Sequence, residues 1–521
     1  MINKQFLNTQ NFLLLIVILF SISINQYYGN KGIFPIESTA YFDTAYRILQ
    51  GDIPFKDYWL VSGMFIDYVQ TVFFWLFGIN FQVYIFHASL INCLIAGMTF
   101  FFVKEIKLGN NLSFFYAITF SVLAYTTSGT LYVDNHASLL CLAAIYLFIF
   151  GVKNGNKKNF FFIPVLIGFA FLTKSAPTIY VFLLFAPVLL LYIFLLKKFE
   201  LILLMFFSSI IFLFVTFLFI FYQGIPLNLF LEQYFYFPMT IANNRYENLL
   251  LSFQNIIFNF KFVYFFLIPL IILNIYKFYS VKKYFLHSEF FIFLSILILS
   301  FGLMFHQMNT QNQLFILFLI PLLCSLLHSE LVQMNLNKKK LINNLLIIIC
   351  IFFTVKYHLR YNEGRKFHEM QNVDFNLAVD AGILDKKLDG LSWISPSYKE
   401  KPMMEIELLK KTIINLKENN QKKMIISNYS FLSSLLDQNL NSPSRWYISN
   451  GAAYPVKNNK YFKNYRNYLI GLILNKEIEA IYVIKPVASK ELFRYVNPEC
   501  FTSNKINLIV TKYEYNKSCN L

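Results

Sequence analysis

Charged residues are scarce in this chain. Only 14% of its 521 residues are Asp, Glu, Lys or Arg, whereas a typical soluble domain has about 25%. Hydrophobic residues make up 57% of the chain, and phenylalanine alone occurs 62 times. One soluble core cannot bury so much apolar side chain. The composition therefore excludes an ordinary soluble protein and predicts a chain that has the lipid bilayer as its solvent.

The sequence also lacks the short motifs of many soluble enzymes. It contains no GxxxxGK[ST] phosphate loop, no GxGxxG, no CxxC pair, no HExxH and no GxSxG. These absences argue against ATP-driven transport and against nucleotide-sugar chemistry in a cytosolic domain. Nucleic acid is not expected as a partner, although the net charge is +17. The basic residues lie mainly between apolar segments, where they anchor a membrane protein and contact lipid headgroups.

Eleven apolar runs have spanning or near-spanning length, so we expect an all-α polytopic membrane protein with about 11 transmembrane helices. They cover residues 12–24, 83–103, 112–131, 137–152, 160–172, 177–196, 201–222, 262–276, 290–305, 314–327 and 341–355. A further apolar stretch, Met64–Phe77, contains Asp67 and Gln70, which favours an amphipathic helix at the membrane surface.

The distribution of Lys and Arg predicts the orientation. With the N-terminus in the cytoplasm, the cytoplasmic connections hold 14 basic residues and the opposite ones, up to the last span, hold 6. This bias favours a cytoplasmic N-terminus. An odd number of spans then places the C-terminal residues outside, and we expect residence in a bacterial cytoplasmic (inner) membrane.

The sequence after about residue 356 is polar and predicts a separate extracytoplasmic domain. We expect two domains, a membrane domain at 1–356 with a first extracytoplasmic loop at 28–82, and a soluble domain at 357–521. Helical patterns at 403–417 and 460–475 alternate with strand-like runs at 423–426 and 480–484, which is typical of a small α/β fold. Cys500 and Cys519 are the two cysteines outside the apolar runs. They either form a disulfide, as an oxidising compartment permits, or stay free thiols.

Polar side chains converge on one face of the membrane in this topology. The segment 34–63, directly after the first apolar run, holds several carboxylates with Arg47 and Tyr58. Other turns bring further polar groups to the same side. Ionisable residues at span ends are costly unless they are paired or solvated, so they are candidates for function. The candidates are Glu37, Asp43, Arg47, Asp57, Tyr58, Asp134, His136, Lys174, His306 and Gln307.

The order of these elements resembles the polytopic GT-C glycosyltransferases, which include dolichyl-phosphate-mannose protein mannosyltransferases and aminoarabinose transferases of lipid A. Their first loop often has an acidic pair, then an aromatic residue, an alanine, a glycine and PYxDYW. Here Glu37, Tyr41, Ala45 and Gly51 keep that spacing, and PFKDYW follows at 54–59. Asp134, Lys174 and the polar turn before the later span HQMNTQNQLFILFLIP also match in order. Glu37 replaces the usual first Asp and Ser38 the second acid.

The resemblance implies transfer of a sugar from a polyprenyl-phosphate donor to a lipid, glycan or protein acceptor at the extracytoplasmic face. Glu37 or Asp43 would be the catalytic carboxylate. Arg47, Asp57, Tyr58, Asp134, His136, Lys174, His306 and Gln307 would bind substrate. A divalent metal (Mg or Mn), held by Glu37 and His306, would assist departure of the phosphate. We expect Glu37, Asp43, Asp134, Lys174 and His306 to line one cavity.

Each candidate also has a purely structural explanation. Asp43 and Arg47 are four residues apart, as in a helical ion pair. Asp57 and Asp134 have the positions of helix caps, and Lys174 resembles a lysine that extends to the membrane surface. As alternative functions, a transporter or flippase of lipid-linked glycans needs polar residues near the bilayer midplane, and a glycan polymerase or ligase needs its large polar loop late in the chain.

Overall fold

The computed structural model describes residues 9–32, 35–127, 129–310, 316–334, 339–364, 370 and 373–521, without the side chains of 35–37, 339 and 363–364. Two compact units make up the chain. The first, called here the helical unit, comprises Met1–Tyr28, Ala88–Thr216 and Asn248–His368. The second, the mixed unit, comprises Gly29–His87, Phe217–Glu247 and Glu369–Leu521.

Each of the eleven predicted apolar runs coincides with a helix or overlaps one, and residues 314 and 315 of the tenth run lie outside the described residues. These helices are α1 (Thr9–Gly29), α4 (Phe81–Glu105), α5 (Gly109–Ala124), α6 (Val133–Asn154), α7 (Lys157–Thr173), α8 (Ser175–Leu195), α9 (Glu200–Tyr222), α13 (Lys261–Ser280), α14 (Ser288–Thr310), α15 (Leu319–Gln333) and α16 (Lys339–Leu359). By length and composition, eight helices among the described residues can cross a membrane. The helices α5, α7 and α15 are shorter, with 16, 17 and 15 residues. The predicted all-α membrane architecture is therefore confirmed, with eight helices of spanning length.

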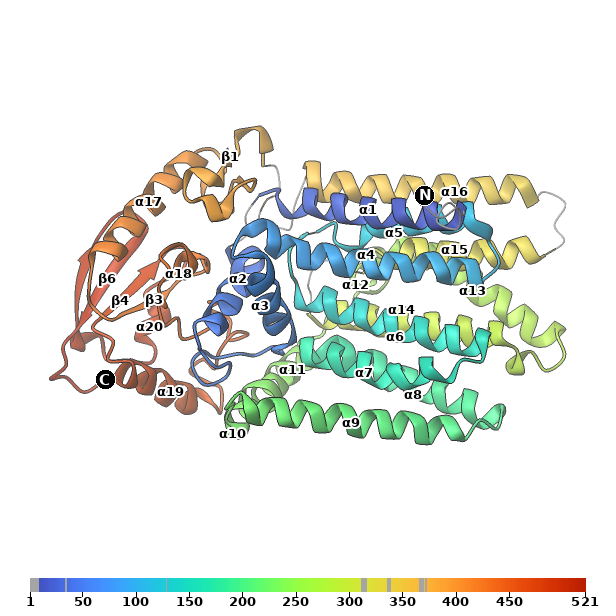
Figure 1. The fold of residues 1–521 in the computed structure, drawn as a ribbon, viewed down its shortest axis with the longest axis horizontal. Coiled ribbons are helices and arrows are strands. Elements are labelled where there is room, and N and C mark those ends of the chain that lie inside the picture. The colour runs from blue at the N-terminus through green and yellow to red at the C-terminus, as the bar shows by residue number, and fades with distance from the viewer. Residues whose placement is uncertain are drawn as a thin grey trace, which may run out of the picture. The chain divides into compact units, whose positions relative to one another are not determined.

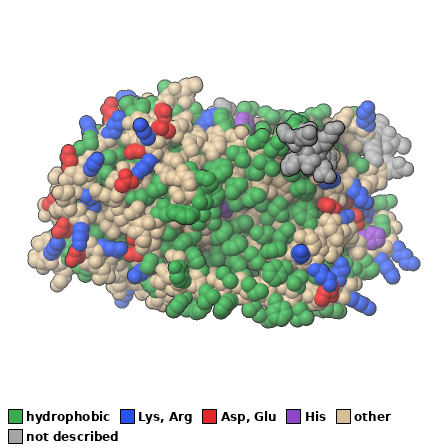
Figure 2. Space-filling view, in the orientation of Figure 1, with side chains coloured by type: hydrophobic (Ala, Val, Ile, Leu, Met, Phe, Trp, Pro, Cys, Tyr) green, Lys and Arg blue, Asp and Glu red, His purple; other side chains and the backbone are tan. Residues whose placement is uncertain are grey.

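Burial differs greatly between these helices. In α6, 83% of the span is buried, whereas only 11% of the α9 span is. α6 packs against α7, α8 and α14, and so occupies the interior of the helical unit. Large exposed hydrophobic residues cover α9 instead, among them Phe206, Phe214 and Phe221. Figure 2 shows hydrophobic side chains spread over the helices of this unit. Such a surface is expected where lipid replaces water.

Basic residues gather at one end of the helical unit, called here its Lys-rich end. Consecutive helices run in opposite directions, so the connections α4–α5, α6–α7, α8–α9, α13–α14 and α15–α16 meet at that end (Figure 1). They carry Lys104, Lys107, Lys153, Lys157, Lys158, Lys197, Lys198, Lys277, Lys282, Lys283 and Lys340. This is the asymmetry on which the predicted orientation depends. Which compartment this end faces stays a prediction.

The mixed unit contains a four-stranded sheet of order β3-β4-β6-β5. Its strands are β3 (Lys423–Ile426), β4 (Ala480–Ile484), β5 (Phe501–Lys505) and β6 (Val510–Tyr515). β3 and β4 are parallel, with Lys423 opposite Ala480, and the other pairs are antiparallel. Between β3 and β4 runs a connection that contains α18 (Leu432–Leu435) and α19 (Phe462–Asn475). The helix α17 (Pro402–Glu418) precedes β3, so the predicted order of helix, strand, helix and strand is confirmed.

Smaller elements complete the unit. They are α2 (Pro35–Leu49), α3 (Phe65–Phe77), α10 (Leu227–Leu231), α11 (Phe237–Glu247), α20 (Lys490–Phe493) and the two-residue strands β1 (Val379–Asp380) and β2 (Ser392–Trp393). The short α12 (Phe253–Ile256) belongs to the helical unit. In α3, Asp67 and Gln70 are buried while Trp75, Leu76 and Phe77 are exposed. Its apolar face is thus the outer one, in keeping with the predicted surface helix.

The first polar loop packs with the C-terminal residues. The Trp59 amide donates to the Pro443 carbonyl at 2.9 Å, and the Trp59 ring lies in a core with Met424, Tyr465 and Ile481. The sequence predicts this loop as part of the membrane domain, whereas the contacts group it with residues 369–521. Side-chain contacts between distant segments of the chain cause the difference.

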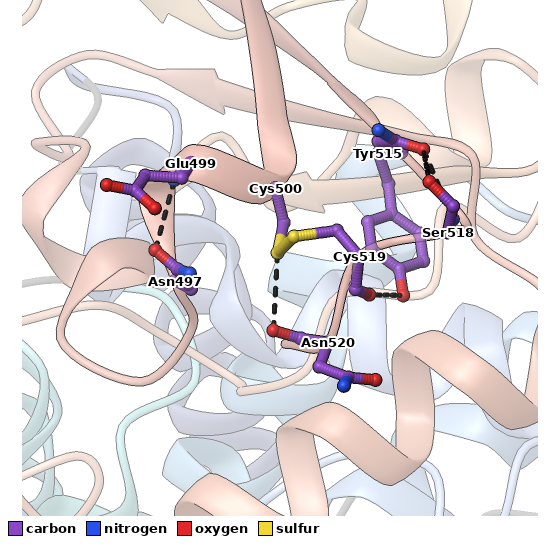
Figure 3. The surroundings of a disulfide bond; sticks show 8 residues. Asn497, Glu499, Cys500, Tyr515, Ser518, Cys519 and Asn520 are labelled. Atoms are coloured by element: carbon purple, nitrogen blue, oxygen red, sulfur yellow. Dashed lines mark hydrogen bonds between the residues drawn. A yellow bond between two sulfur atoms is a disulfide. The ribbon is translucent and has the colours of Figure 1, made fainter.

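The cysteines lie as the sequence suggested. Cys500 and Cys519 form a disulfide that links the start of β5 to the residues after β6 (Figure 3). The alternative of two free thiols does not hold in this structure. Cys93, Cys141, Cys324 and Cys350 are buried and free, so they serve as packing residues.

Candidate functional site

A buried charge cluster on the first loop, called here the loop cluster, lies wholly within the mixed unit. The helix α2 carries Asp43 and Arg47 one turn apart, and their Oδ2 and Nη1 atoms are 4.0 Å apart. Arg47 Nε also binds Asp52 Oδ2 at 2.7 Å. Lys476 from the end of α19 lies 3.7 Å from Asp52 and 3.0 Å from Asp57. Three carboxylates thus share two cations.

Arg47 is fixed on several sides at once. Its Nη1 donates to the Ser442 carbonyl at 2.6 Å and its Nη2 donates to the Asp57 carbonyl at 3.1 Å. The guanidinium carbon is 4.7 Å from the centre of the Tyr58 ring, which is a favourable cation–π distance. The side chain is 1% exposed. These contacts make Arg47 an organising residue of the loop cluster, and direct binding of substrate by Arg47 stays a prediction.

Asp43 differs from its neighbours in protonation. Burial raises the pKa of Asp43 to about 6, although Arg47 and a hydrogen bond from Ser433 oppose the shift. For Asp52 the attraction and hydrogen bonding of Arg47 outweigh burial and lower its pKa. The loop cluster therefore contains one carboxyl that titrates close to neutral pH and one that stays ionised. A carboxylate with a pKa near the working pH is suited to general base catalysis.

A second buried ion pair in the mixed unit was not predicted as part of a site. Arg445 binds Asp67 of α3 through Nη2 and Ser62 Oγ through Nη1 at 2.6 Å. Its guanidinium carbon is 4.7 Å from the Tyr41 ring centre, and Thr44 donates to Asp67. Asp67 and Arg445 are 378 residues apart in the sequence. No local signal marks Arg445, so only the fold reveals the pair.

A third cluster, called here the helix-end cluster, lies in the helical unit, at the end opposite the lysines. Asp134 is in the first turn of α6, Lys174 joins α7 to α8, and His306 is near the end of α14. His306 Nε2 is 2.6 Å from Asp134 Oδ1, and Lys174 Nζ is 3.5 Å from Asp134 Oδ2. Asp134 and His306 are buried, whereas the Lys174 side chain is 25% exposed. The buried Asp134 carboxylate therefore contacts both a buried histidine and a lysine whose side chain is partly exposed.

The remaining candidates in the helical unit follow Asp134 and His306 closely in the sequence. His136 Nδ1 is 2.9 Å from the Tyr125 hydroxyl, and Gln307 is buried beside His306 on α14. Asn309, the second-last residue of the same helix, donates to the Tyr180 hydroxyl at 2.9 Å. Three of the five residues expected to share a cavity, Asp134, Lys174 and His306, thus lie together. Asp43 belongs to the mixed unit, and the shared cavity stays a prediction.

Glu37 and the metal site stay predictions as well. Glu37 lies within α2, but its side chain is outside the described residues. His306 Nε2 already pairs with the Asp134 carboxylate, and His306 Nδ1 is buried without a hydrogen-bond partner in the described parts of the chain. Those parts contain no group of three or more His, Cys, Asp or Glu side chains arranged so that they could hold a metal ion. A carboxylate with one imidazole fits only a metal that is held mainly by water and substrate, as magnesium often is.

The fold is that of a polytopic membrane protein with a small α/β unit. No protein-family model and no curated protein match the chain. Among solved structures it is similar to the crystal structure of ArnT from Cupriavidus metallidurans bound to undecaprenyl phosphate. The sequence identity is 11%, 97% of this chain and 98% of that chain are covered, and the TM-score is 0.48.

Proposed function

We propose that the chain is an integral-membrane glycosyltransferase that moves a sugar from a polyprenyl-phosphate donor to a lipid, glycan or protein acceptor. The observation that carries the proposal is Asp43, a buried carboxyl whose pKa is about 6 in a cluster that also holds Arg47. Sugar transfer to a hydroxyl needs a base of this kind at a membrane surface, while the prenyl chain of the donor stays in lipid.

In the proposed reaction the acceptor hydroxyl attacks the anomeric carbon of the sugar. The new bond joins the acceptor oxygen to that carbon, and the bond from the carbon to the phosphate oxygen breaks. The acceptor proton passes to the Asp43 carboxylate, and the polyprenyl phosphate leaves with the bonding electrons. One displacement of this type inverts the anomeric centre.

The departing phosphate needs positive charge, and Lys174 is the proposed source. Its side chain is partly exposed, and its Nζ lies 3.5 Å from the Asp134 carboxylate. His306, which Asp134 also holds, is the second proposed contact. Fixed cations in a site with little water stabilise developing negative charge strongly. Glu37 and His306 remain the proposed holders of a magnesium or manganese ion, for which loss of turnover in a chelator, restored by either ion, is the test.

Transport of lipid-linked glycans is the alternative function. It calls for polar residues near the middle of the spans. In the helical unit Asp134, Lys174 and His306 lie instead at helix ends. This position favours chemistry at one membrane surface. Under the proposal the surface is the extracytoplasmic one of a bacterial inner membrane.

The deciding experiment follows transfer by the purified full chain in nanodiscs, with radiolabelled polyprenyl-phosphate sugars as donors. Glu37→Gln and Asp43→Asn each remove one candidate base at nearly constant volume. Glu407→Gln, an exposed position on α17, is the matched control. Loss in Asp43→Asn alone assigns the base, and loss in Glu37→Gln alone moves the role to Glu37. Normal turnover in both variants would contradict the mechanism.

A further inference from the structure

An open hollow lies at the Lys-rich end of the helical unit, away from the helix-end cluster. Its volume is about 430 Å³, and α5, α15 and α16 form its walls. The lining residues are Leu112, His328, Lys340, Asn343, Asn344 and Ile347. Lys340 and Asn344 are exposed. The groups that face the hollow include an ammonium, two amides and an imidazole, so most of the polar atoms there can donate hydrogen bonds.

His328 is the residue that points to a ligand. It is 1% exposed, and its Nδ1 is 2.9 Å from the Tyr116 hydroxyl. When Tyr116 donates this hydrogen bond, the proton of the neutral ring is on Nε2. Nε2 is buried and has no partner among the described residues. A buried donor without a partner costs free energy, so the structure leaves one unmet hydrogen bond at the wall of the hollow.

The helix α16, which forms one wall of the hollow, also carries an exposed apolar surface. Along α16, exposed hydrophobic residues follow at intervals of three or four, and so form one stripe on the helix. They are Leu341, Leu345, Ile348, Phe352 and Val355, each about half exposed or more. The stripe begins beside Lys340 and runs toward the middle of the span. A hollow with a basic side chain and several hydrogen-bond donors, next to an apolar helix surface, is complementary to a molecule that has an anionic headgroup and an acyl chain.

We propose that this hollow binds the headgroup of an anionic phospholipid. Lys340 pairs with the phosphate as a charge, while the Asn343 and Asn344 amides and His328 Nε2–H donate hydrogen bonds to its oxygens. One acyl chain lies along the apolar stripe of α16. The site is at the opposite end of the helical unit from Lys174, so it is separate from the proposed transfer chemistry and independent of it.

The test measures lipid retention by the purified full chain with native mass spectrometry, after addition of phosphatidylglycerol or phosphatidylcholine. We expect phosphatidylglycerol to be retained about tenfold more strongly. Lys340→Gln and Asn344→Leu should each remove most of this preference, because both residues are exposed and their loss leaves the fold intact. Lys282→Gln, an exposed lysine at the same end outside the hollow, should keep it.

Three results would overturn the proposal. Equal retention of the two lipids would remove the headgroup preference. An equal loss in Lys282→Gln would show general attraction by the basic end instead of a site. Inorganic phosphate that binds to the wild-type chain and not to Lys340→Gln, without any lipid preference, would assign the hollow to a free anion.

Discussion

Replacing Asp43 with Asn should abolish transfer and stabilise the protein at the same time. Burial raises the pKa of this carboxyl from 3.8 to about 6. The protonated form therefore stabilises the fold fully below pH 3.8, and that stability is lost as the pH rises through 6. This rise in pKa corresponds to about 3 kcal/mol of folding free energy. Because Asn is neutral at every pH, the Asp43→Asn variant retains this stabilisation at high pH as well.

The rest of the loop cluster should tolerate the change. Arg47 keeps Asp52 at 2.7 Å and the Ser442 carbonyl at 2.6 Å. The loss of Asp43 removes only the more distant of its two carboxylate partners, at 4.0 Å. At pH 8 the variant should therefore be more stable than the wild type by nearly the full amount of about 3 kcal/mol. At pH 4 the two proteins should be equally stable.

Two measurements check this. The thermal midpoint in nanodiscs should be higher for Asp43→Asn than for the wild type at pH 8, and the two should converge at low pH. Wild-type turnover should rise with pH to half its maximum near pH 6. Turnover in Asp43→Asn should be lower by a factor of about 10² to 10⁴ and should lack this rise. A lower midpoint at pH 8 would refute the burial of an ionised carboxyl, and an unchanged pH profile would refute its role as base.

Four further predictions follow from other residues. Lys174→Met should lower turnover by about 10² to 10³, while Lys174→Arg keeps most of it; equal loss in both would point to a structural role. Arg445→Met leaves a buried carboxylate without its partner and should destabilise the protein by about 3–5 kcal/mol, measured by denaturant titration; an unchanged midpoint would contradict this. Cys500→Ser opens a disulfide between residues 19 apart and should cost about 3 kcal/mol, measured under oxidising conditions and absent in reductant. Reporter fusions after Lys340 and Leu521 should report opposite compartments, and the same compartment for both would overturn the orientation.

Local patterns were sufficient to predict the long apolar helices and two of the four strands in the main sheet, whereas β5 and β6 were not predicted. The apolar runs indicated eleven helices, and the strand-like runs at 423–426 and 480–484 coincide with β3 and β4. Errors occur where polar residues interrupt a run. The third run was expected to continue to residue 131, but α5 ends at Ala124. A turn at Gly129, with a φ of 69°, follows before α6 begins.

The partners of the charged residues could not be predicted. Arg47 and Asp43 are neighbours on one helix, so their spacing revealed the pair. The Ser442 carbonyl that binds Arg47, and Arg445 that binds Asp67, come from nearly 400 residues later. A buried ion pair between distant segments has no local pattern, because each charge alone resembles a solvated one. For the same reason the sequence separated the first loop from the C-terminal residues that complete it.

That late completion has a consequence for how the protein is made. Asp67 leaves the ribosome 378 residues before Arg445, which is roughly 20 to 80 s at ordinary rates of translation. During that interval the first loop is already synthesised, and Asp67 and Asp57 lack Arg445 and Lys476, the cations that later pair with them. Arg47 can pair with Asp52 from the start, but the loop cluster is completed only when Lys476 has been made. A chain that stops before Arg445 should insert its helices normally and still be inactive.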